Sequence, residues 1–154
     1  MLLLTCYAVH AQDMHSVFGL VLGQEVPNAT KDIGDSQFSV YEHPLSEGPL
    51  SDYFQHIEVT VAPPRTVAVL SALRAYENGL ECMEERAELE RLLEIVFPVV
   101  RDGGMGVRET KGGESRLSLS CSTSGSVPYY SLKLNVTHQP SLDALRAALL
   151  EQNH

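Results

Sequence analysis

The feature of the sequence that most constrains the fold is strict alternation of apolar and polar residues in three separate stretches. These stretches are residues 57–61, 117–121 and 130–137. Side chains of a β-strand point alternately to the two faces of a sheet, so this period is typical of a strand with one buried face. A fourth β-rich run, residues 66–73, follows the turn-forming Pro63-Pro64-Arg65. Residues 57–61 and 66–73 are therefore predicted to pair as an antiparallel hairpin.

Two other segments have the period of an amphipathic helix. The first covers residues 82–97, and its apolar residues recur at spacings of three and four: Leu89, Leu92, Leu93, Val96 and Phe97. Glutamates occupy its first turn, where the helix dipole favours acids, and Pro98 ends it. The second helix is predicted at the C-terminus with Ser141 as its N-cap. Its apolar face carries Leu142, Leu145 and Leu149.

The predicted elements follow in the order ββ-α-ββ-α, preceded by one or two further strands. One of these is a short buried strand over residues 17–23, bounded by glycine. Antiparallel strands with one polar face indicate an α+β fold, with an antiparallel sheet of four to six strands and helices on one face. The length of 154 residues suits one domain, which we expect to cover residues 12–154.

The first eleven residues, MLLLTCYAVHA, are uncharged and mostly apolar, and Val9-His10-Ala11 resembles a signal-peptide cleavage site. We therefore expect residues 1–11 to be a signal peptide or its remnant, which makes the mature chain periplasmic or secreted. No basic segment precedes the apolar run, so two other interpretations stay open. One is a lipoprotein acylated at Cys6, and the other is an ordinary first strand of a cytosolic protein. No apolar run approaches the roughly 20 residues needed to span a bilayer.

Removal of this leader would leave two of the three cysteines, Cys82 and Cys121. Cys82 lies near the apolar stripe of the predicted helix, and Cys121 lies on the apolar face of the predicted strand 117–121. Both are therefore expected to face the core. An even pair of cysteines in an oxidising compartment usually forms a disulfide, so we predict a Cys82–Cys121 bridge. The alternative is two buried free thiols.

No motif for catalysis, a metal or a cofactor stands out. The sequence has no Gly-x-Ser-x-Gly nucleophile motif and no His-x-x-x-His or Cys-x-x-Cys pair. The segment Gly103-Gly104-Met105-Gly106 lacks the strand–loop–helix context of a phosphate-binding loop. A thiol–imidazole pair of Cys121 and His138 would need the sulfur that the disulfide uses. We therefore predict no catalytic residue, no metal ligand and no cofactor, and a non-catalytic protein is favoured over an enzyme.

The net charge is −9, from 20 acidic residues against 11 lysines and arginines. Binding to nucleic acid or to anionic lipid needs a basic surface, so neither is expected. A charge of this sign would instead steer the chain towards a basic protein partner. The other interpretation is that the charge only keeps the protein soluble.

Two predicted surfaces are suited to such a partner. The polar side of the helix 82–97 is acidic, and the non-core face of the sheet is rich in hydroxyl and amide groups. The candidate interaction residues are Glu84, Glu85 and Glu88 on the helix and Glu58, Thr60, Ser118, Ser120, Lys133 and Asn135 on the sheet. For both surfaces, the alternative is an ordinary solvated face.

The segment Phe18-Gly19-Leu20-Val21-Leu22-Gly23 precedes the strand pair, the acidic helix that begins with a cysteine and the strand that carries the other cysteine. With its Phe-Gly-x-x-Leu-Gly opening after a signal peptide and its one disulfide, this arrangement resembles small exported bacterial proteins of unknown function. The layout is also similar to that of small periplasmic inhibitor and immunity proteins, which pair a sheet with one helix. The resemblance assigns no functional residue.

The leading hypothesis is a non-catalytic exported binding module that acts by protein–protein contact. It would be an inhibitor or immunity-type protein for a basic partner, such as a cell-wall hydrolase or a toxin. Two alternatives stay open: a small envelope enzyme with an unrecognised site, and an accessory subunit of an envelope assembly. A cleft with convergent titratable side chains would favour the enzyme, and a long exposed apolar patch would favour the assembly.

Overall fold

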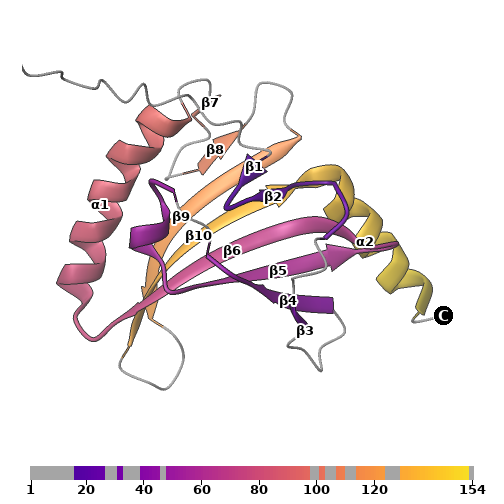
Figure 1. Ribbon diagram of the computed structural model, residues 1–154, viewed down its shortest axis with the longest axis horizontal. Coiled ribbons are helices and arrows are strands. Elements are labelled where there is room, and N and C mark those ends of the chain that lie inside the picture. Colours follow the sequence, from indigo (N-terminus) through magenta and orange to yellow (C-terminus); the bar gives the residue numbers. More distant parts are fainter. Residues whose placement is uncertain are drawn as a thin grey trace, which may run out of the picture.

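The computed structural model describes residues 16–26, 31–32, 39–45, 48–97, 101–102, 107–109, 114–123 and 129–152. Over these residues the chain forms an antiparallel sheet with two α-helices and one disulfide, so the predicted α+β fold class is confirmed (Figure 1). The predicted leader, residues 1–11, and the glycine-rich segment 103–106 lie outside the described residues.

Five strands of the main sheet are five or more residues long. They are β4 (Ser39–His43), β5 (His56–Ala62), β6 (Thr66–Tyr76), β9 (Ser115–Thr123) and β10 (Tyr130–His138). Three short strands, β3 (Lys31–Asp32), β7 (Arg101–Asp102) and β8 (Val107–Glu109), extend the edges. The order among the described residues is β3-β4-β5-β6-β10-β9-β8-β7. The predicted hairpin is β5–β6, and β6 continues beyond the predicted run 66–73 to Tyr76.

The centre of the sheet brings the predicted alternating residues into register. Leu134 of β10 lies opposite Ala72 of β6 on one side and Leu119 of β9 on the other. All three side chains are buried. Because successive side chains of a strand point to opposite faces, the apolar residues of these strands share one face and the polar residues share the other.

Helix α1 (Gly79–Val96) covers the apolar face, with Leu89 and Leu93 fully buried against it. The sequence predicts that this helix begins at Cys82, with a turn at Asn78-Gly79. It begins earlier because the Asn78 side chain accepts a hydrogen bond from the backbone N–H of Leu80 (2.8 Å) and so caps the helix. Asparagine followed by glycine is also a common turn sequence, so the start of this helix was predicted as a turn.

The predicted disulfide is confirmed. Cys82, in the first turns of α1, is bonded to Cys121 of β9, with the sulfur atoms 2.03 Å apart and the Cα atoms 6.1 Å apart. Cys82 is fully buried and Cys121 is half-buried on the same face. The bridge therefore fixes the N-terminal part of α1 to the sheet.

The predicted strand over residues 17–23 is wrong. These residues form a small hairpin of β1 (Ser16–Val17) and β2 (Leu20–Val21), joined by a turn at Phe18 and Gly19. The two turn residues have φ values of 54° and 75°, as a type I′ turn requires. A bulky residue rarely adopts positive φ. Here the Phe18 ring is buried edge-on against Phe54, with the centroids 5.9 Å apart, and this packing offsets the backbone strain.

Helix α2 (Gln139–Gln152) packs in a second apolar cluster. Its Leu145 packs with Ala62 and Ala68, and the predicted Leu142 and Leu149 lie beside it. The β5–β6 register shifts here, and the bulge turns Ala68 and Val69 towards α2, whereas Leu70 belongs to the α1 side. We expected the helices on one face, but α2 packs with Ala62, Ala68 and Val69 on the face opposite to the α1 cluster, and Figure 1 shows the two helices at opposite ends of the sheet.

Candidate functional site

The strand register assembles the predicted surface on the sheet. One row across β5, β6, β10 and β9 consists of Glu58, Ser71, Asn135 and Ser118, and the next row consists of His56, Leu73, Lys133 and Ser120. Thr60 lies one row further along β5, towards α2. In the first row, Ser71 Oγ donates a hydrogen bond to Asn135 Oδ1 (2.7 Å). This face therefore uses part of its hydrogen-bonding capacity internally.

The predicted acidic residues of α1 lie on the other side of the molecule. The helix carries six glutamates and two arginines, and Glu84 and Glu88 are exposed while Glu85 is half-buried. We call Glu81, Glu84, Glu85 and Glu88 the acidic face. The sheet separates it from the row that contains Glu58, because α1 packs on the apolar face. The structure therefore does not join the two predicted surfaces into one site.

A hydrogen bond from the neighbouring segment 51–53 fixes the position of Glu88 in the acidic face. The 3-10 helix η1 (Ser51–Tyr53) lies beside α1, and the Tyr53 hydroxyl donates a hydrogen bond to Glu88 Oε1 (3.1 Å). Burial, and then the hydrogen bond and charge of Glu88, raise the pKa of Tyr53. The phenol therefore stays neutral and remains a donor at neutral pH.

The arginines near the acidic face are engaged in local contacts. Arg86 donates hydrogen bonds from Nε and Nη2 to Glu90 Oε1 (3.1 and 3.0 Å). Arg74 Nη1 donates to the backbone oxygen of Asp52 (3.0 Å), and its guanidinium lies 5.3 Å from the centre of the Tyr76 ring. Arg86 is paired with Glu90, and the four glutamates of the acidic face outnumber Arg74 and Arg91, so the net charge on this side of the molecule is negative.

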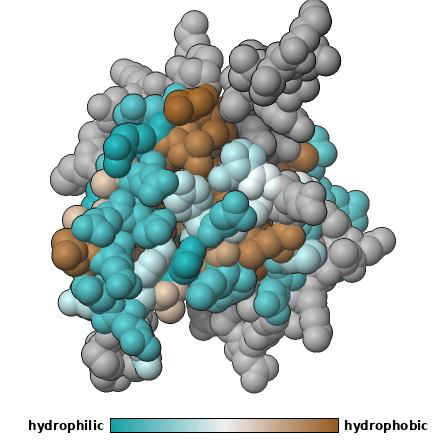
Figure 2. All heavy atoms as spheres, turned by 60° about the vertical axis from the view of Figure 1, so that its left-hand side comes forward, coloured by the Kyte–Doolittle hydropathy of each residue, from teal (hydrophilic) through white to brown (hydrophobic). Residues whose placement is uncertain are grey.

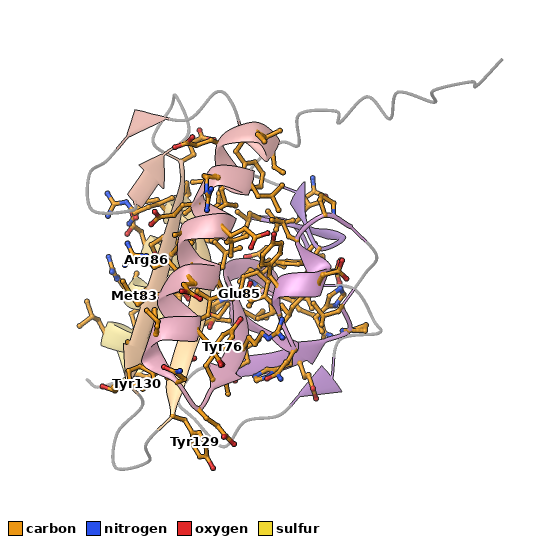
Figure 3. All side chains as sticks on the ribbon, turned by 90° about the vertical axis from the view of Figure 1, so that its left-hand side faces the viewer. Tyr76, Met83, Glu85, Arg86, Tyr129 and Tyr130 are labelled. Carbon is orange, nitrogen blue, oxygen red and sulfur yellow. A yellow bond between two sulfur atoms is a disulfide. The ribbon has the colours of Figure 1, made fainter. Side chains whose placement is uncertain are left out.

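Sequence reasoning missed a group of aromatic and apolar side chains at the start of α1. Tyr130 lies opposite Tyr76 in the β10–β6 ladder, and its ring rests on Gly79, where an added Cβ would be 2.7 Å from the ring. Tyr129 directly precedes Tyr130 in the chain, and Figure 3 shows Tyr76, Tyr129 and Tyr130 at this end of the molecule. We call Tyr76, Leu80, Met83, Tyr129 and Tyr130 the aromatic corner. Its members come from two segments, residues 76–83 and 129–130, which are far apart in the sequence, so no local pattern indicates that they meet.

The Tyr76 hydroxyl is the unusual atom of the aromatic corner. It is buried and has no hydrogen-bond partner among the described residues. Burial raises the pKa of Tyr76, against the opposing effect of Arg74. In the folded state the proton is therefore held more tightly than in the unfolded chain. Stability consequently falls as the pH rises above the ordinary tyrosine value of 10.0, where the unfolded chain ionises first.

Replacing Tyr76 by phenylalanine is expected to raise the free energy of unfolding by about 1 kcal/mol. The change removes a buried hydroxyl that has no partner and keeps the ring beneath Arg74. Urea unfolding at neutral pH measures the effect. Tyr130→Phe is the matched control, because that residue is half-exposed, and it should change stability by less than about 0.5 kcal/mol. A less stable Tyr76→Phe protein would contradict the prediction.

A serine–histidine pair, also not predicted, lies at the start of α2. His138 Nδ1 is 2.7 Å from Ser141 Oγ. The predicted role of Ser141 as N-cap is wrong, because α2 begins at Gln139 and the Ser141 hydroxyl bonds to His138 instead. Such a pair can activate a nucleophile, but Ser141 is buried and the His138 ring packs on Gly23. The pair therefore fixes the start of α2 to the N-terminal segment.

The described residues hold no group of three or more His, Cys, Asp or Glu side chains arranged to bind a metal ion. In the same part of the chain, neither helix combines the length and apolar character that a membrane span requires. Comparisons with protein-family models, with curated proteins and with solved structures find no match to this chain.

Proposed function

We propose that the protein is a non-catalytic exported binding module that contacts a basic protein partner, as an inhibitor or immunity-type protein would. One observation carries this proposal: exposed glutamates and exposed apolar side chains share the outer side of α1. Glu84 and Glu88 lie there with Leu80 and Met83, whose exposed fractions are 66% and 49%. Figure 2 shows a mostly hydrophilic side with separate hydrophobic patches. Apolar residues rimmed by polar ones are typical of protein interaction sites.

The charge of this surface supports a basic partner. Clustered charge of one sign raises the rate at which an oppositely charged protein is captured, and repels partners of the same sign. Arg86 is paired with Glu90, and the other nearby cations, Arg74 and Arg91, are fewer than the four glutamates of the acidic face. The sheet surface is less suited to this role, since it mixes Lys133 with Glu58 and bonds Ser71 to Asn135.

Export is supported by the Cys82–Cys121 bridge. Disulfides persist in the periplasm and outside the cell, whereas glutathione and thioredoxin keep most cytosolic thiols reduced. In this proposal, residues 1–11 act as the leader, and the bridge forms after transport. The bridge then holds the acidic face at a fixed position over the sheet.

Photocrosslinking in cells of the source organism tests the binding function. The photoreactive residue p-benzoylphenylalanine replaces Glu84 in one protein and Ser122, on the opposite face of the sheet, in the control. We expect a discrete adduct with a basic protein from position 84 and none from position 122. Adding Glu81→Lys should weaken that adduct, whereas Glu151→Lys on α2 should not. An acidic partner, or no adduct from position 84, would overturn the proposal.

The same cells test the export step through the intact mass of the non-reduced protein. The periplasmic fraction should contain a chain that begins at Gln12 and lacks the two hydrogen atoms lost in forming the Cys82–Cys121 bridge. A chain retained in the cytoplasm with its leader would contradict export. The crosslinking experiment would still test independently whether the acidic face contacts a basic protein.

A further inference from the structure

We infer that the aromatic corner is the anchor point of the acidic face, and that it accepts a large apolar side chain flanked by arginine or lysine. This inference rests on the proposed function and adds the part of the surface that makes the contact and the chemistry it recognises.

The aromatic corner has three exposed apolar side chains: Leu80 and Met83 on α1, and Tyr129 at the same end of the molecule (Figure 3). Leu80 and Met83 are spaced by three residues, which places them side by side on a helix. Tyr129 directly precedes Tyr130, whose ring rests on Gly79, next to Leu80 in the chain. The exposed fractions of Leu80, Met83 and Tyr129 are 66%, 49% and 46%. Tyrosine and methionine are enriched in the central parts of interfaces, and tyrosine in the residues that dominate binding energy.

The elements that carry these side chains are held firmly. The Asn78 cap fixes the first turn of α1, and the disulfide at Cys82 ties the residue before Met83 to β9. The contact between Tyr130 and Gly79 fixes the start of β10 against the same turn. A surface whose backbone is already ordered loses little conformational entropy when a partner binds, so more of its contact energy contributes to affinity.

The charges around the aromatic corner determine what flanks the apolar side chain of the partner. Glu77, Glu81 and Glu84 are exposed beside it. A second copy of this chain would bring the same glutamates together, so self-association is disfavoured and a basic partner is favoured. Within the aromatic corner, the Arg74 guanidinium already makes a cation–π contact with the Tyr76 ring. Tyr129 and Tyr130 offer the same kind of ring to an arginine of the partner.

A peptide titration tests this inference without a known partner. The probe is a short fluorescein-labelled peptide in which two leucines are flanked by arginines, and fluorescence anisotropy measures its affinity for the full chain. Two further peptides replace either the leucines by serine or the arginines by glutamate. We expect the first peptide to bind, the serine peptide to bind about tenfold more weakly, and the glutamate peptide not to bind.

Two variants test whether the peptide binds at the aromatic corner. Met83→Ala combined with Tyr129→Ala should weaken binding of the arginine–leucine peptide about tenfold. Leu150→Ala removes an apolar side chain of α2 that is more exposed (67%) than either of these, and it should leave binding unchanged. Urea unfolding should show that all variants fold as the wild type does. The inference is overturned if the double variant binds normally, if the serine peptide binds as well as the leucine peptide, or if gel filtration shows dimers that the double variant abolishes.

The crosslinking experiment separates this inference from the proposed function. If the double variant leaves the adduct from position 84 at full yield, the binding function stands and the aromatic corner is not its anchor. If no adduct forms from position 84 in any protein, the proposed function fails, and the peptide titration still decides whether the corner binds a basic apolar segment.

Discussion

Replacing Cys82 and Cys121 by alanine is expected to lower the free energy of unfolding by about 4 kcal/mol, the largest loss that we predict. The bridge spans 39 residues, and without it the unfolded chain regains the entropy of an open loop of that length. The protein also loses the covalent link between α1 and β9. Urea unfolding of the double variant and of the oxidised wild type measures the difference.

A reducing agent provides the matched control for this prediction. Reduction should destabilise the wild type by a similar amount, and it should leave the unfolding of the double variant unchanged because that protein has no bridge. If the double variant unfolds within about 1 kcal/mol of the oxidised wild type, the bridge is not a main source of stability. The position of the acidic face over the sheet would then depend on the packing of Leu89 and Leu93.

Replacing Gly23 by alanine is expected to cost about 3 kcal/mol of unfolding free energy. Gly23 has a φ of +76°, which strains any other residue, and an added Cβ would lie 2.6 Å from Cε1 of His138. Neither group is free to move away. The backbone N–H of Gly23 donates to the oxygen of Val67 (2.8 Å), and His138 is bonded to Ser141. Thermal and urea unfolding of the variant check the loss.

Two further proteins separate the causes of this loss. Gly48→Ala is the matched control, because its Cβ would meet only the Ser51 hydroxyl oxygen at 3.7 Å, and its stability should change by less than about 0.5 kcal/mol. In a His138→Ala background the steric overlap disappears, so Gly23→Ala should cost only about 1 kcal/mol from the positive φ. Equal losses from Gly23→Ala and Gly48→Ala would show that the N-terminal segment does not pack as described.

The regular elements could be predicted because their residues repeat with the period of the structure they form. Alternation located β5, β9 and β10, and the spacing of Leu89, Leu93 and Val96 located α1. The disulfide followed from the same patterns, since they turned Cys82 and Cys121 towards one core. These predictions depend only on residues close together in the chain.

The N-terminal hairpin shows why local patterns failed elsewhere. Phenylalanine is an unusual residue at the first position of a type I′ turn, so Phe18-Gly19 gave no turn signal. Its conformation is stabilised by Phe54, which the sequence places far away. The start of α1 failed for a related reason, because Asn78 caps a helix with the same side chain that favours turns.

The candidate surfaces were predicted in part. Exposure of Glu84 and Glu88 followed from the helical period, and the row of Glu58, Asn135 and Ser118 followed from strand alternation. Because α1 packs on the apolar face, these two sets lie on opposite sides of the sheet, as the predicted faces imply. A function that needs both surfaces at once is therefore disfavoured, and the acidic face is the better candidate.

By itself, the amino-acid sequence determined the long strands and helices and the sides that they bury, because each of these depends on spacing along one short segment. The pairing of Cys82 with Cys121 followed because each cysteine lies on the buried side of its own element. Tertiary structure alone decided that Tyr130 rests on Gly79 beside Leu80 and Met83, and that His138 meets Gly23. Those contacts join residues from distant parts of the chain. Their geometry depends on how the strands register and how the helices dock, which no local period specifies.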